Sequence, residues 1–497
     1  MTKQTRSWLT ALRLATLALV VLPLTAQAAP ARPYGLSREV LSVQRIDERV
    51  LGFVDVDFLR FEDEVRTQEG IQENKAERVP FRVAEPISLD ASPANAGTRE
   101  TLAEGGTLWR LRVTSPGAVF LSFTLREVSL PPGARLSFYS VDHAFETELY
   151  SARIHNSERR FGSPAIPGDS AVVELFTPAA AAWEPSLVVE SVSHGYRDFN
   201  RFHAVPLRNR LRSVTGEAWN LNKLGACEVD VNCQPGNQWQ ADKRAVARTY
   251  DGRYLCTGAL INNARQDCRP LFLTAAHCVS RSRTAAAMTF YWNYENSACG
   301  GGDAPLNQTT SGATLRVTGS GSDFTLLELN SRPNSAYNVY YAGFDRSAAP
   351  PASAVAIHHP TGAAKKISFE NDPVEDGGDF SDGWGGTHWR IAGWDVGTTE
   401  GGSSGCPLFN SAHRIVGQLH GGTADCGGGW DEFGKLSSSW GAGLASYLDP
   451  NASGLTALGG KESSTCSGGS CLPRGSACAA NSQCCSKSCR KQSKTCA

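Results

Sequence analysis

The chain has 497 residues, of which 48 are Lys or Arg and 49 are Asp or Glu, and its formal net charge is −1. Because the charges balance, the composition gives no broad electrostatic surface for binding nucleic acid or an anionic membrane. The length exceeds what one hydrophobic core usually organises, so we expect several domains.

The first 28 residues have the pattern of a secretion signal. Three cations lie within the first 13 residues, an apolar run covers 14–24, and the small-x-small sequence Ala26-Gln27-Ala28 follows as a cleavage site. A membrane anchor is the alternative, but crossing a bilayer takes about 20 apolar residues, whereas this run is shorter and contains Pro23. We therefore expect a signal peptide at 1–28, a secreted, extracellular protein, and no membrane or nucleic-acid partner.

Residues 29–223 contain no cysteine and show the alternation of β-strands. Trp109, Leu111 and Val113, for example, share one face of a strand-like run that ends at the turn 115–117. Further runs of the same kind follow, separated by Pro/Gly turns. The pattern predicts a β-rich segment that resembles a β-sandwich.

All 15 cysteines lie at or after Cys227, and export makes disulfides expected there. Short apolar runs, frequent glycine and few helical periods predict a β-barrel domain at 224–458. A Gly/Ser-rich linker is expected at 459–470, followed by a small cysteine-dense domain at 471–497. The cysteine and histidine spacings do not match those of zinc sites, so we expect no metal and no cofactor.

Three stretches supply the groups that acyl transfer by a serine requires. Ser404, in the glycine-flanked stretch 402–407, is the candidate nucleophile. His277 ends an apolar run and is the candidate base, while Asp323 opens another apolar run and is the acid that would orient the base.

The backbone around Ser404 also offers donors for an oxyanion. Gly402 permits a tight turn that points its own amide and that of Ser404 inward, and these two amides form the candidate oxyanion hole. Each catalytic candidate has a structural alternative when taken alone, because single histidines and turn aspartates are usually structural. The order His277, Asp323, Ser404 along the chain favours a catalytic triad.

These motifs resemble those of chymotrypsin-like serine proteases, and in detail those of bacterial lysyl endopeptidases. The narrower match is carried by stretches dispersed over 227–450, namely Tyr291-Trp292-Asn293-Tyr294, 322–329, Ile357-His358-His359-Pro360, 399–407 and 417–422. The resemblance implies an all-β fold, a double antiparallel β-barrel with the active site in the cleft between the barrels. It implies a serine endopeptidase that cleaves proteins or peptides on the carboxyl side of lysine.

The position of the first β-rich segment, before the catalytic motifs of a secreted protease, indicates its role. We expect 29–223 to be a propeptide that helps the enzyme fold and inhibits it, with a retained binding domain as the alternative. The stretch 208–223 is basic, and exposed basic linkers are readily cut. Lys223 is therefore a candidate site of self-processing.

Trypsin's specificity aspartate lies six residues before its nucleophile, but this chain has Thr398 there. The resemblance places the specificity acid downstream instead, at Asp431. A carboxylate at the bottom of a pocket selects substrates with a cation. Asp425 and Glu432 are competing acids, and solvated loop charges are the alternative for all three.

Other substrate-binding residues follow from the same resemblance. His420 and Trp384 are expected to shape the site, and Gly421 lies in the strand that would pair with an extended substrate. Ser403 replaces the acid that binds a freed amino terminus in trypsin, and no Ile-Val-Gly-Gly start is present. We therefore expect control by removal of 29–223.

The resemblance implies three disulfides in the barrels: Cys227–Cys426, Cys233–Cys299 and Cys256–Cys278. Cys268 and Cys406 remain there, and we expect them to pair with each other. The tail has the cysteine spacing of knottin-like mini-domains, whose order would give Cys471–Cys485, Cys478–Cys489 and Cys484–Cys496. Cys466 is then the odd cysteine, and the basic tail is a candidate for docking on a surface or polymer.

Three other functions compete with a lysyl endopeptidase. A trypsin-like or broader specificity is the nearest. An inactive, protease-like binding or adhesive protein belongs to a different class, but such a protein would be expected to lack a triad residue. An esterase of the α/β-hydrolase type would need parallel βαβ organisation, which this sequence does not show.

Overall fold

The computed structural model describes residues 46–72, 80–102, 105–198, 225–301, 304–377 and 386–466. All of them belong to one compact unit that begins at Ile46. The signal peptide, Lys223, Trp384 and the tail at 471–497 with its three expected disulfides lie outside the described residues. No helix within these ranges is long and apolar enough to cross a membrane.

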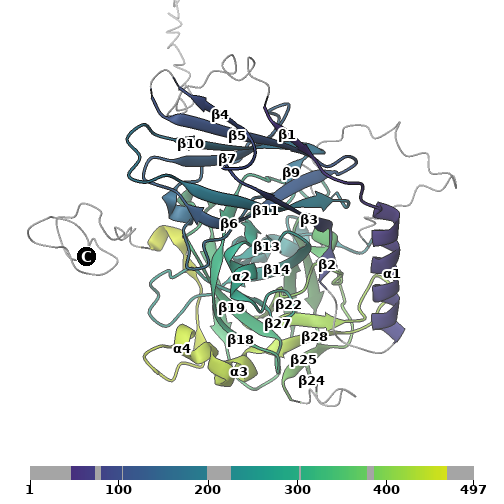
Figure 1. Cartoon of the computed structure of the whole chain (residues 1–497). Helices are drawn as coiled ribbons and strands as arrows, with labels where there is room; N and C mark the ends of the chain where they lie inside the picture. Colours follow the sequence, from purple (N-terminus) through teal and green to yellow (C-terminus); the bar gives the residue numbers. More distant parts are fainter. Residues whose placement is uncertain are drawn as a thin grey trace, which may run out of the picture. The chain divides into compact units, whose positions relative to one another are not determined.

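The segment before the barrels folds into two five-stranded sheets, in the orders β1-β5-β10-β7 and β3-β11-β6-β8 (Figure 1). β4 adds to β5, and β9 adds to β6. The strands are β1 (Glu48–Val50), β3 (Ala84–Ala91), β4 (Thr98–Thr101), β5 (Thr107–Thr114), β6 (Phe120–Ser129), β7 (Arg135–Ser140), β8 (Phe161–Gly162), β9 (Ile166–Pro167), β10 (Ser170–Thr177) and β11 (Ser186–Gly195). Trp109, Leu111 and Val113 of β5 enter a core shared by both sheets, as the alternation predicts.

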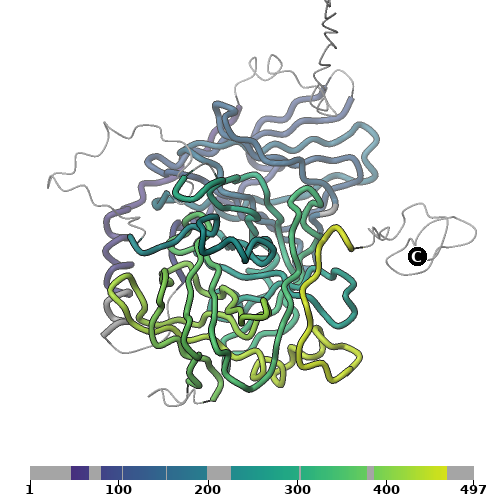
Figure 2. Tube along the Cα trace, turned by 180° about the vertical axis from the view of Figure 1, so that it is seen from behind, coloured from purple at the N-terminus to yellow at the C-terminus, as the bar shows by residue number. Residues whose placement is uncertain are grey.

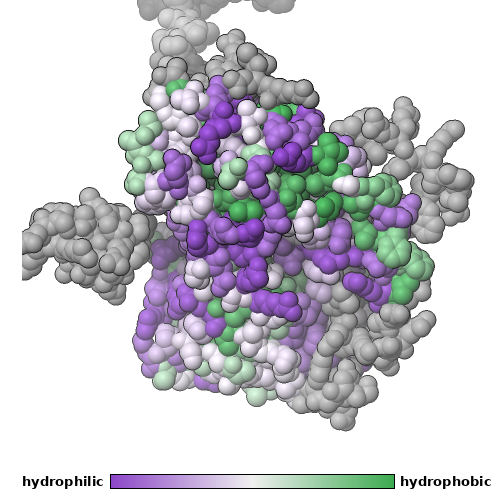
Figure 3. All heavy atoms as spheres, in the orientation of Figure 1, coloured by the Kyte–Doolittle hydropathy of each residue, from purple (hydrophilic) through white to green (hydrophobic). Residues whose placement is uncertain are grey.

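One helix, α1 (Val56–Gln72), lies in the chain between β1 and β3 of this sandwich and was not predicted from the sequence. The buried guanidinium of Arg82 fastens it, because this side chain donates to Asp63 Oδ1 at 2.7 Å and to Leu59 O at 2.8 Å. Phe58 and Phe61 of α1 are exposed, and Figure 3 shows apolar surface there. The helix is therefore held by ion pairing more than by its apolar residues.

The first barrel sheet has the order β17-β16-β13-β14-β15-β19-β18. Its elements are β13 (Val246–Tyr250), β14 (Tyr254–Leu260), β15 (Leu271–Ala275), β16 (Thr289–Tyr291), β17 (Thr309–Ser311), β18 (Ala313–Gly319) and β19 (Phe324–Leu329), with helix α2 (Ser282–Ala286). Antiparallel pairing of β15 with β19 brings Ala275 opposite Phe324. This register puts the two chain ends that carry His277 and Asp323 side by side.

The second barrel sheet has the order β12-β23-β22-β26-β27-β28-β25-β24, with β21 added at β27 and β29 added at β21. Its strands are β12 (Val229–Asp230), β21 (Gly343–Asp345), β22 (Ala354–His358), β23 (Lys366–Glu370), β24 (Glu375–Gly377), β25 (His388–Ile391), β26 (Pro407–Asn410), β27 (Arg414–Gly422), β28 (Asp431–Lys435) and β29 (Ala457–Leu458). Helices α3 (Leu436–Ser439) and α4 (Ala445–Leu448) follow β28. Ser404 precedes β26, and Asp431 begins β28. The described residues form an all-β fold with two barrel sheets after the sandwich, as predicted.

The end of the described chain packs on the first barrel, where a linker was expected (Figure 2). β30 (Lys461–Glu462) pairs with β20 (Tyr340–Tyr341), and Asn262 Nδ2 donates to Gly459 O at 2.9 Å. A 3₁₀ helix, Ser463–Thr465, leads to Cys466. The expected linker of 459–470 therefore does not begin at 459, because 459–466 is attached to the barrel.

Disulfides join Cys227 to Cys426, Cys233 to Cys299 and Cys256 to Cys278, as expected. The expected bridge between Cys268 and Cys406 is wrong, because Cys268 pairs with Cys466. Cys268 and Cys406 do not pair because they lie in different cores. Cys268 lies in the core of the first barrel, against which Cys466 packs, whereas Cys406 is buried in a core of the second barrel.

Candidate active site

The ends of β15 and β19 hold His277 against Asp323. Asp323 Oδ2 lies 2.6 Å from His277 Nδ1, and Asp323 Oδ1 accepts the backbone amide of His277 at 2.9 Å. Ala276 in turn donates its amide to Asp323 O at 2.9 Å. The carboxylate thus contacts both the ring and the backbone amide of His277. These contacts fix the ring's orientation and leave Nε2 for proton transfer.

Asp323 is suited to remain ionised. Burial favours its neutral form, but the attraction and hydrogen bonds of His277 outweigh burial, so the pKa of Asp323 lies below its ordinary value of 3.8. Only 4% of the residue is exposed. A buried anion at this place stabilises the imidazolium that forms when His277 accepts a proton.

The turn that carries Ser404 packs on β14 and β15. Thr257 donates its amide to Ser404 O at 2.8 Å and its hydroxyl to Gly402 O at 2.9 Å. The neighbouring Cys256 is bridged to Cys278, the residue after His277. Strand β14 therefore holds the candidate nucleophile and the candidate base on one framework.

Gly402 has the backbone conformation that the candidate oxyanion hole requires. Its φ is 96°, and a Cβ atom here would lie 2.9 Å from His359 O. Among the described residues, neither the amide of Gly402 nor that of Ser404 has an assigned acceptor, while the two carbonyls are engaged by Thr257. The Ser404 hydroxyl is buried and has no hydrogen-bond partner within the described part of the chain.

A second histidine, His420, lies close to Asp323. His420 Nε2 lies 3.7 Å from Asp323 Oδ2, and His420 Nδ1 lies 3.1 Å from His388 Nε2. Burial lowers the pKa of His420 to about 3, although Asp323 acts in the opposite direction. His420 is therefore neutral near pH 7. The sequence singled out His420 but not His388, which lies on a different strand, β25.

Asp431 is fully buried at the start of β28 and is linked to the Ser404 loop. Its Oδ2 accepts hydrogen bonds from Thr399 Oγ1 and Trp394 Nε1, both at 2.7 Å. Two donors on one oxygen hold the carboxylate in a single orientation. The strand pairing Gly422↔Asp431 places this acid beside β27, the strand expected to bind an extended substrate through Gly421.

The competing acids differ from Asp431 in their surroundings. Asp425 is exposed and accepts the amide of Gly427 at 2.6 Å, as a turn aspartate does. Glu432 is buried but, as the next residue of the same strand, faces the opposite side of the sheet. Trp394 was missed by the sequence analysis. Its position in the loop between β25 and Thr399 was the available signal.

Two groups of side chains in the described ranges lie close enough to hold a metal ion. The first is Cys256, His277 and Cys278, but its two cysteines form a disulfide and offer no thiolate. The second is His277, Asp323 and His420. There the direct hydrogen bond between His277 and Asp323 matches an acid–base pair, and we assign neither group to a metal.

Comparisons with known proteins identify both parts of the chain. Residues 63–196 match the family described as "Lysyl endopeptidase N-terminal domain", and residues 221–434 match "Lysyl endopeptidase, C-terminal domain". A lysyl endopeptidase of Pseudomonas aeruginosa is 32% identical over 352 residues, which cover 64% of this chain and 69% of the relative.

Solved structures match more weakly. The inactive form of the Rv3671c protease is 20% identical, with a TM-score of 0.28 over 41% of this chain and 90% of that chain. A Glu endopeptidase in complex with MPD is 16% identical, with a TM-score of 0.28 over 41% of this chain and 91% of that chain. The assignment therefore depends on the sequence matches, which cover both the segment before the barrels and the barrels themselves. This chain is a serine endopeptidase and belongs to the lysyl endopeptidase family.

Proposed function

We propose that the protein is a secreted endopeptidase that hydrolyses peptide bonds on the carboxyl side of lysine, with Ser404, His277 and Asp323 as its catalytic triad. The observation that carries the lysine preference is the buried carboxylate of Asp431, held by Thr399 and Trp394 in the loop that leads to Ser404. A buried acid favours a substrate side chain that brings a compensating cation.

The proposed catalytic step uses the hydrogen-bonded pair of His277 and Asp323. Ser404 attacks the peptide carbonyl while His277 takes the hydroxyl proton, and Asp323 stabilises the imidazolium. The amides of Gly402 and Ser404 donate to the oxyanion. His277 then gives the proton to the leaving amine, and water hydrolyses the acyl-enzyme by the same route.

Residues 29–223 act in this proposal as a propeptide that aids folding and inhibits the enzyme. Strand β2 (Phe81–Arg82) pairs antiparallel with β14, with Phe81 opposite Leu255, directly before Cys256. The Phe81 ring also packs against Gly401, where an added Cβ would lie 3.1 Å from it. A strand in this place competes with any extended substrate that would approach the turn of Ser404.

A shared core supports the folding role. Val83, Phe120 and Ala165 of the sandwich segment are buried in one cluster with Tyr250 and Tyr291 of the first barrel. Hydrogen bonds cross this contact, from the amide of Ala165 to the Tyr291 hydroxyl at 2.8 Å and between the Ser122 and Tyr250 hydroxyls at 2.9 Å. An apolar surface of this kind favours folding of the first barrel against the sandwich.

Four finer assignments belong to the same proposal. The signal peptide at 1–28 directs secretion, and cleavage near Lys223 separates the propeptide. The barrels span 224 to about 458 with the attached stretch to Cys466. The tail at 471–497 is a knottin-like domain that docks on a surface or polymer.

Digestion of an unstructured polypeptide by the purified enzyme tests the proposal. Mass spectrometry of the fragments should find lysine at their carboxyl ends, and a Ser404→Ala variant should produce none of these cuts. Ser411→Ala, at an exposed serine in the turn after β26, is the matched control and should cleave like the wild type. Cuts that persist in Ser404→Ala, or cuts without lysine preference, would overturn the corresponding part of the proposal.

A further inference from the structure

Ser403, the neighbour of the candidate nucleophile, is fully buried and engaged on two sides. Its hydroxyl lies 2.8 Å from His358 Nδ1 and accepts the amide of Glu400 at 3.2 Å. The amide of Ser403 donates to Glu400 O at 2.9 Å. The turn 400–403 is thus closed on itself, and two side chains tie it to the barrels: Thr257 through Gly402 O, and His358, at the end of β22, through the Ser403 hydroxyl.

The directions of these hydrogen bonds follow from the single proton of each hydroxyl. Ser368 donates its proton to Thr398 O at 2.7 Å, so at 3.1 Å it accepts one from His358 Nε2. A neutral imidazole protonated on Nε2 has an acceptor at Nδ1. His358 Nδ1 therefore accepts a hydrogen bond from the Ser403 hydroxyl. Each group in this series of hydrogen bonds then has a defined role as donor or acceptor.

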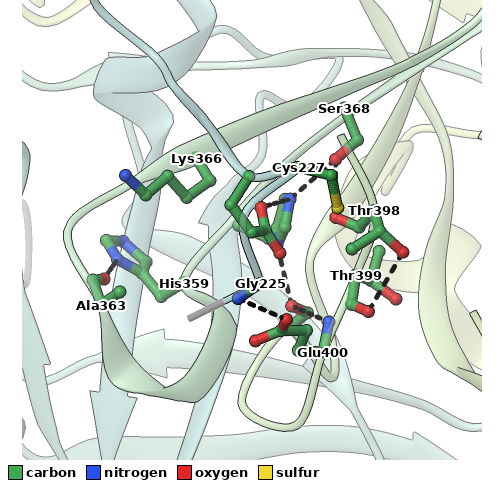
Figure 4. A network of polar contacts seen from close by, with 12 residues as sticks. Gly225, Cys227, His359, Ala363, Lys366, Ser368, Thr398, Thr399 and Glu400 are labelled. Atoms are coloured by element: carbon green, nitrogen blue, oxygen red, sulfur yellow. Dashed lines mark hydrogen bonds and ion pairs between the residues drawn. The ribbon is translucent and has the colours of Figure 1, made fainter. Parts of the chain in front are cut away.

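The first residues of the protease segment reach the same turn. The amide of Gly225 donates to Glu400 Oε1 at 2.9 Å (Figure 4). Cys227, two residues later, is bridged to Cys426. Figure 4 shows Gly225 and Glu400 meeting below Thr398 and Ser368. Neither contact uses a free amino terminus, so both exist in the uncut chain.

A buried acid completes this environment. The Glu228 side chain is fully buried, with Oε2 at 3.9 Å from His358 Nε2, and its carboxylate oxygens have no hydrogen-bond partner among the described residues. Burial and the nearby Glu400 raise the pKa of Glu228 well above its ordinary value of 4.5, with Asp431 adding to and Lys366 opposing this shift. This shift favours the neutral form of Glu228, which exerts no charge that would draw a proton onto His358.

We propose that His358 is a positioning residue for the oxyanion hole: it holds Ser403, and through Ser403 it aligns the amides of Gly402 and Ser404. The proposal rests on the triad and oxyanion hole of the proposed function. It gives His358 and Ser403 the task that an ion pair with a freed amino terminus performs in trypsin. Accordingly the oxyanion hole is already formed in the uncut chain, and removal of the propeptide uncovers it.

The test compares variants of His358 in full-length chains matured by another protease, whose recognition sequence is placed within 208–223. Maturation then does not depend on the activity of the variant. His358→Phe removes the acceptor, whereas His358→Asn keeps a carbonyl oxygen near the position of Nδ1. His413→Asn, at a hydrogen-bonded histidine of the same barrel that is not near the turn, is the matched control.

His358→Phe should lower kcat per titrated active site by about tenfold to a hundredfold, somewhat less than deletion of an oxyanion donor, with KM nearly unchanged. A peptide aldehyde, whose tetrahedral adduct needs the oxyanion hole, should bind more weakly by the same factor. n-Butylamine, which probes only the specificity pocket, should bind equally well. His358→Asn should restore most of kcat, and Ser403→Ala combined with His358→Phe should be no worse than His358→Phe alone.

A His358→Phe enzyme that is thermally less stable but keeps wild-type kcat and aldehyde affinity would show a merely structural histidine and would overturn the proposal. If His358→Phe does not fold, Ser403→Ala carries the same comparison of kcat with aldehyde and butylamine binding. Failure of the proposed function is a separate result, because it would appear in the wild type as a lack of lysine-directed cleavage.

Discussion

Thr399 Oγ1 donates a hydrogen bond of 2.7 Å to Asp431 Oδ2. This contact joins the loop that leads to Ser404 with the first residue of β28, although 32 positions separate the two residues in the chain. The candidate pocket acid and the loop of the candidate nucleophile are consequently joined by a direct hydrogen bond. In the proposed function, this contact aligns substrate bound at the acid with the turn that carries Ser404.

Replacing the pocket acid should remove the lysine preference. Asp431→Asn should lower kcat/KM for lysyl peptides by about a hundredfold to a thousandfold, because a substrate cation would then be buried without its counter-charge. For peptides with a neutral residue before the cleaved bond, kcat/KM should decrease far less. Asp425→Asn, at the exposed turn acid, should behave like the wild type in the same peptide assays, and equal losses in both variants would contradict the assignment.

The depressed pKa of His420 should make the folded enzyme lose stability on acidification. The pKa is about 3 in the folded state against an ordinary value of 6.5. Between these values the unfolded chain binds more protons, so this contribution is fully present above pH 6.5 and is lost as pH falls toward 3. The loss is about 1.4 kcal/mol per pH unit below 6.5.

Urea unfolding of the Ser404→Ala enzyme at pH 5, 6 and 7 measures this slope without self-digestion. In the Ser404→Ala, His420→Gln enzyme the free energy of unfolding should decrease less steeply from pH 6.5 to pH 5. Identical slopes in the two proteins would show that His420 does not titrate as its burial predicts.

The strand of Phe81 should restrain the uncut enzyme. In a full chain whose basic residues in 208–223 are replaced by glutamine, Phe81→Ser should raise hydrolysis of a lysyl peptide by about tenfold. The reason is the loss of the apolar contact with Gly401, since burial of a phenylalanine contributes about 1.5–3 kcal/mol. Phe58→Ser, at an exposed phenylalanine of α1, is the control and should leave hydrolysis low. If the Phe81→Ser chain hydrolyses the peptide as slowly as the Phe58→Ser chain, the result would argue against inhibition by β2.

The bridge between Cys268 and Cys466 should be recovered as one linked peptide pair by mass spectrometry of the unreduced protein. Removing either cysteine should lower the free energy of unfolding by about 2–5 kcal/mol, because the bridge closes a long loop of the unfolded chain. Removing both should cost no more than removing one. A linked pair containing Cys268 and Cys406 would contradict the structure.

Local sequence was sufficient for features that depend on neighbours along the chain. The β-strand alternation around Trp109 predicted a strand that contributes to a shared core, and the structure confirms the all-β fold. The short motifs around His277, Asp323 and Ser404 were recognisable because tight turns at strand ends impose small residues and glycine at fixed spacings. Their catalytic roles remain predictions, supported by the hydrogen bonds between His277 and Asp323.

Other features depended on distances that no local pattern contains. Helix α1 has few buried apolar residues, so its sequence lacks the apolar periodicity that would predict a helix. Arg82, which fastens the helix, lies outside it in the chain. Trp394 and His388 became part of the site only because β25 lies beside β28 in the second sheet. Neither residue stands in a motif with the group that it contacts.

The sequence by itself determined the type of fold, the enzyme class and the candidate nucleophile, because these depend on periodicity and on motifs a few residues long. Only the tertiary structure decided which cysteine bridges Cys268, which donors hold Asp431, and how His358 supports Ser403. The physical reason is that each of these contacts joins distant segments across a barrel. Such pairings are set by strand order and by which core a side chain enters, and both arise only when the sheets assemble.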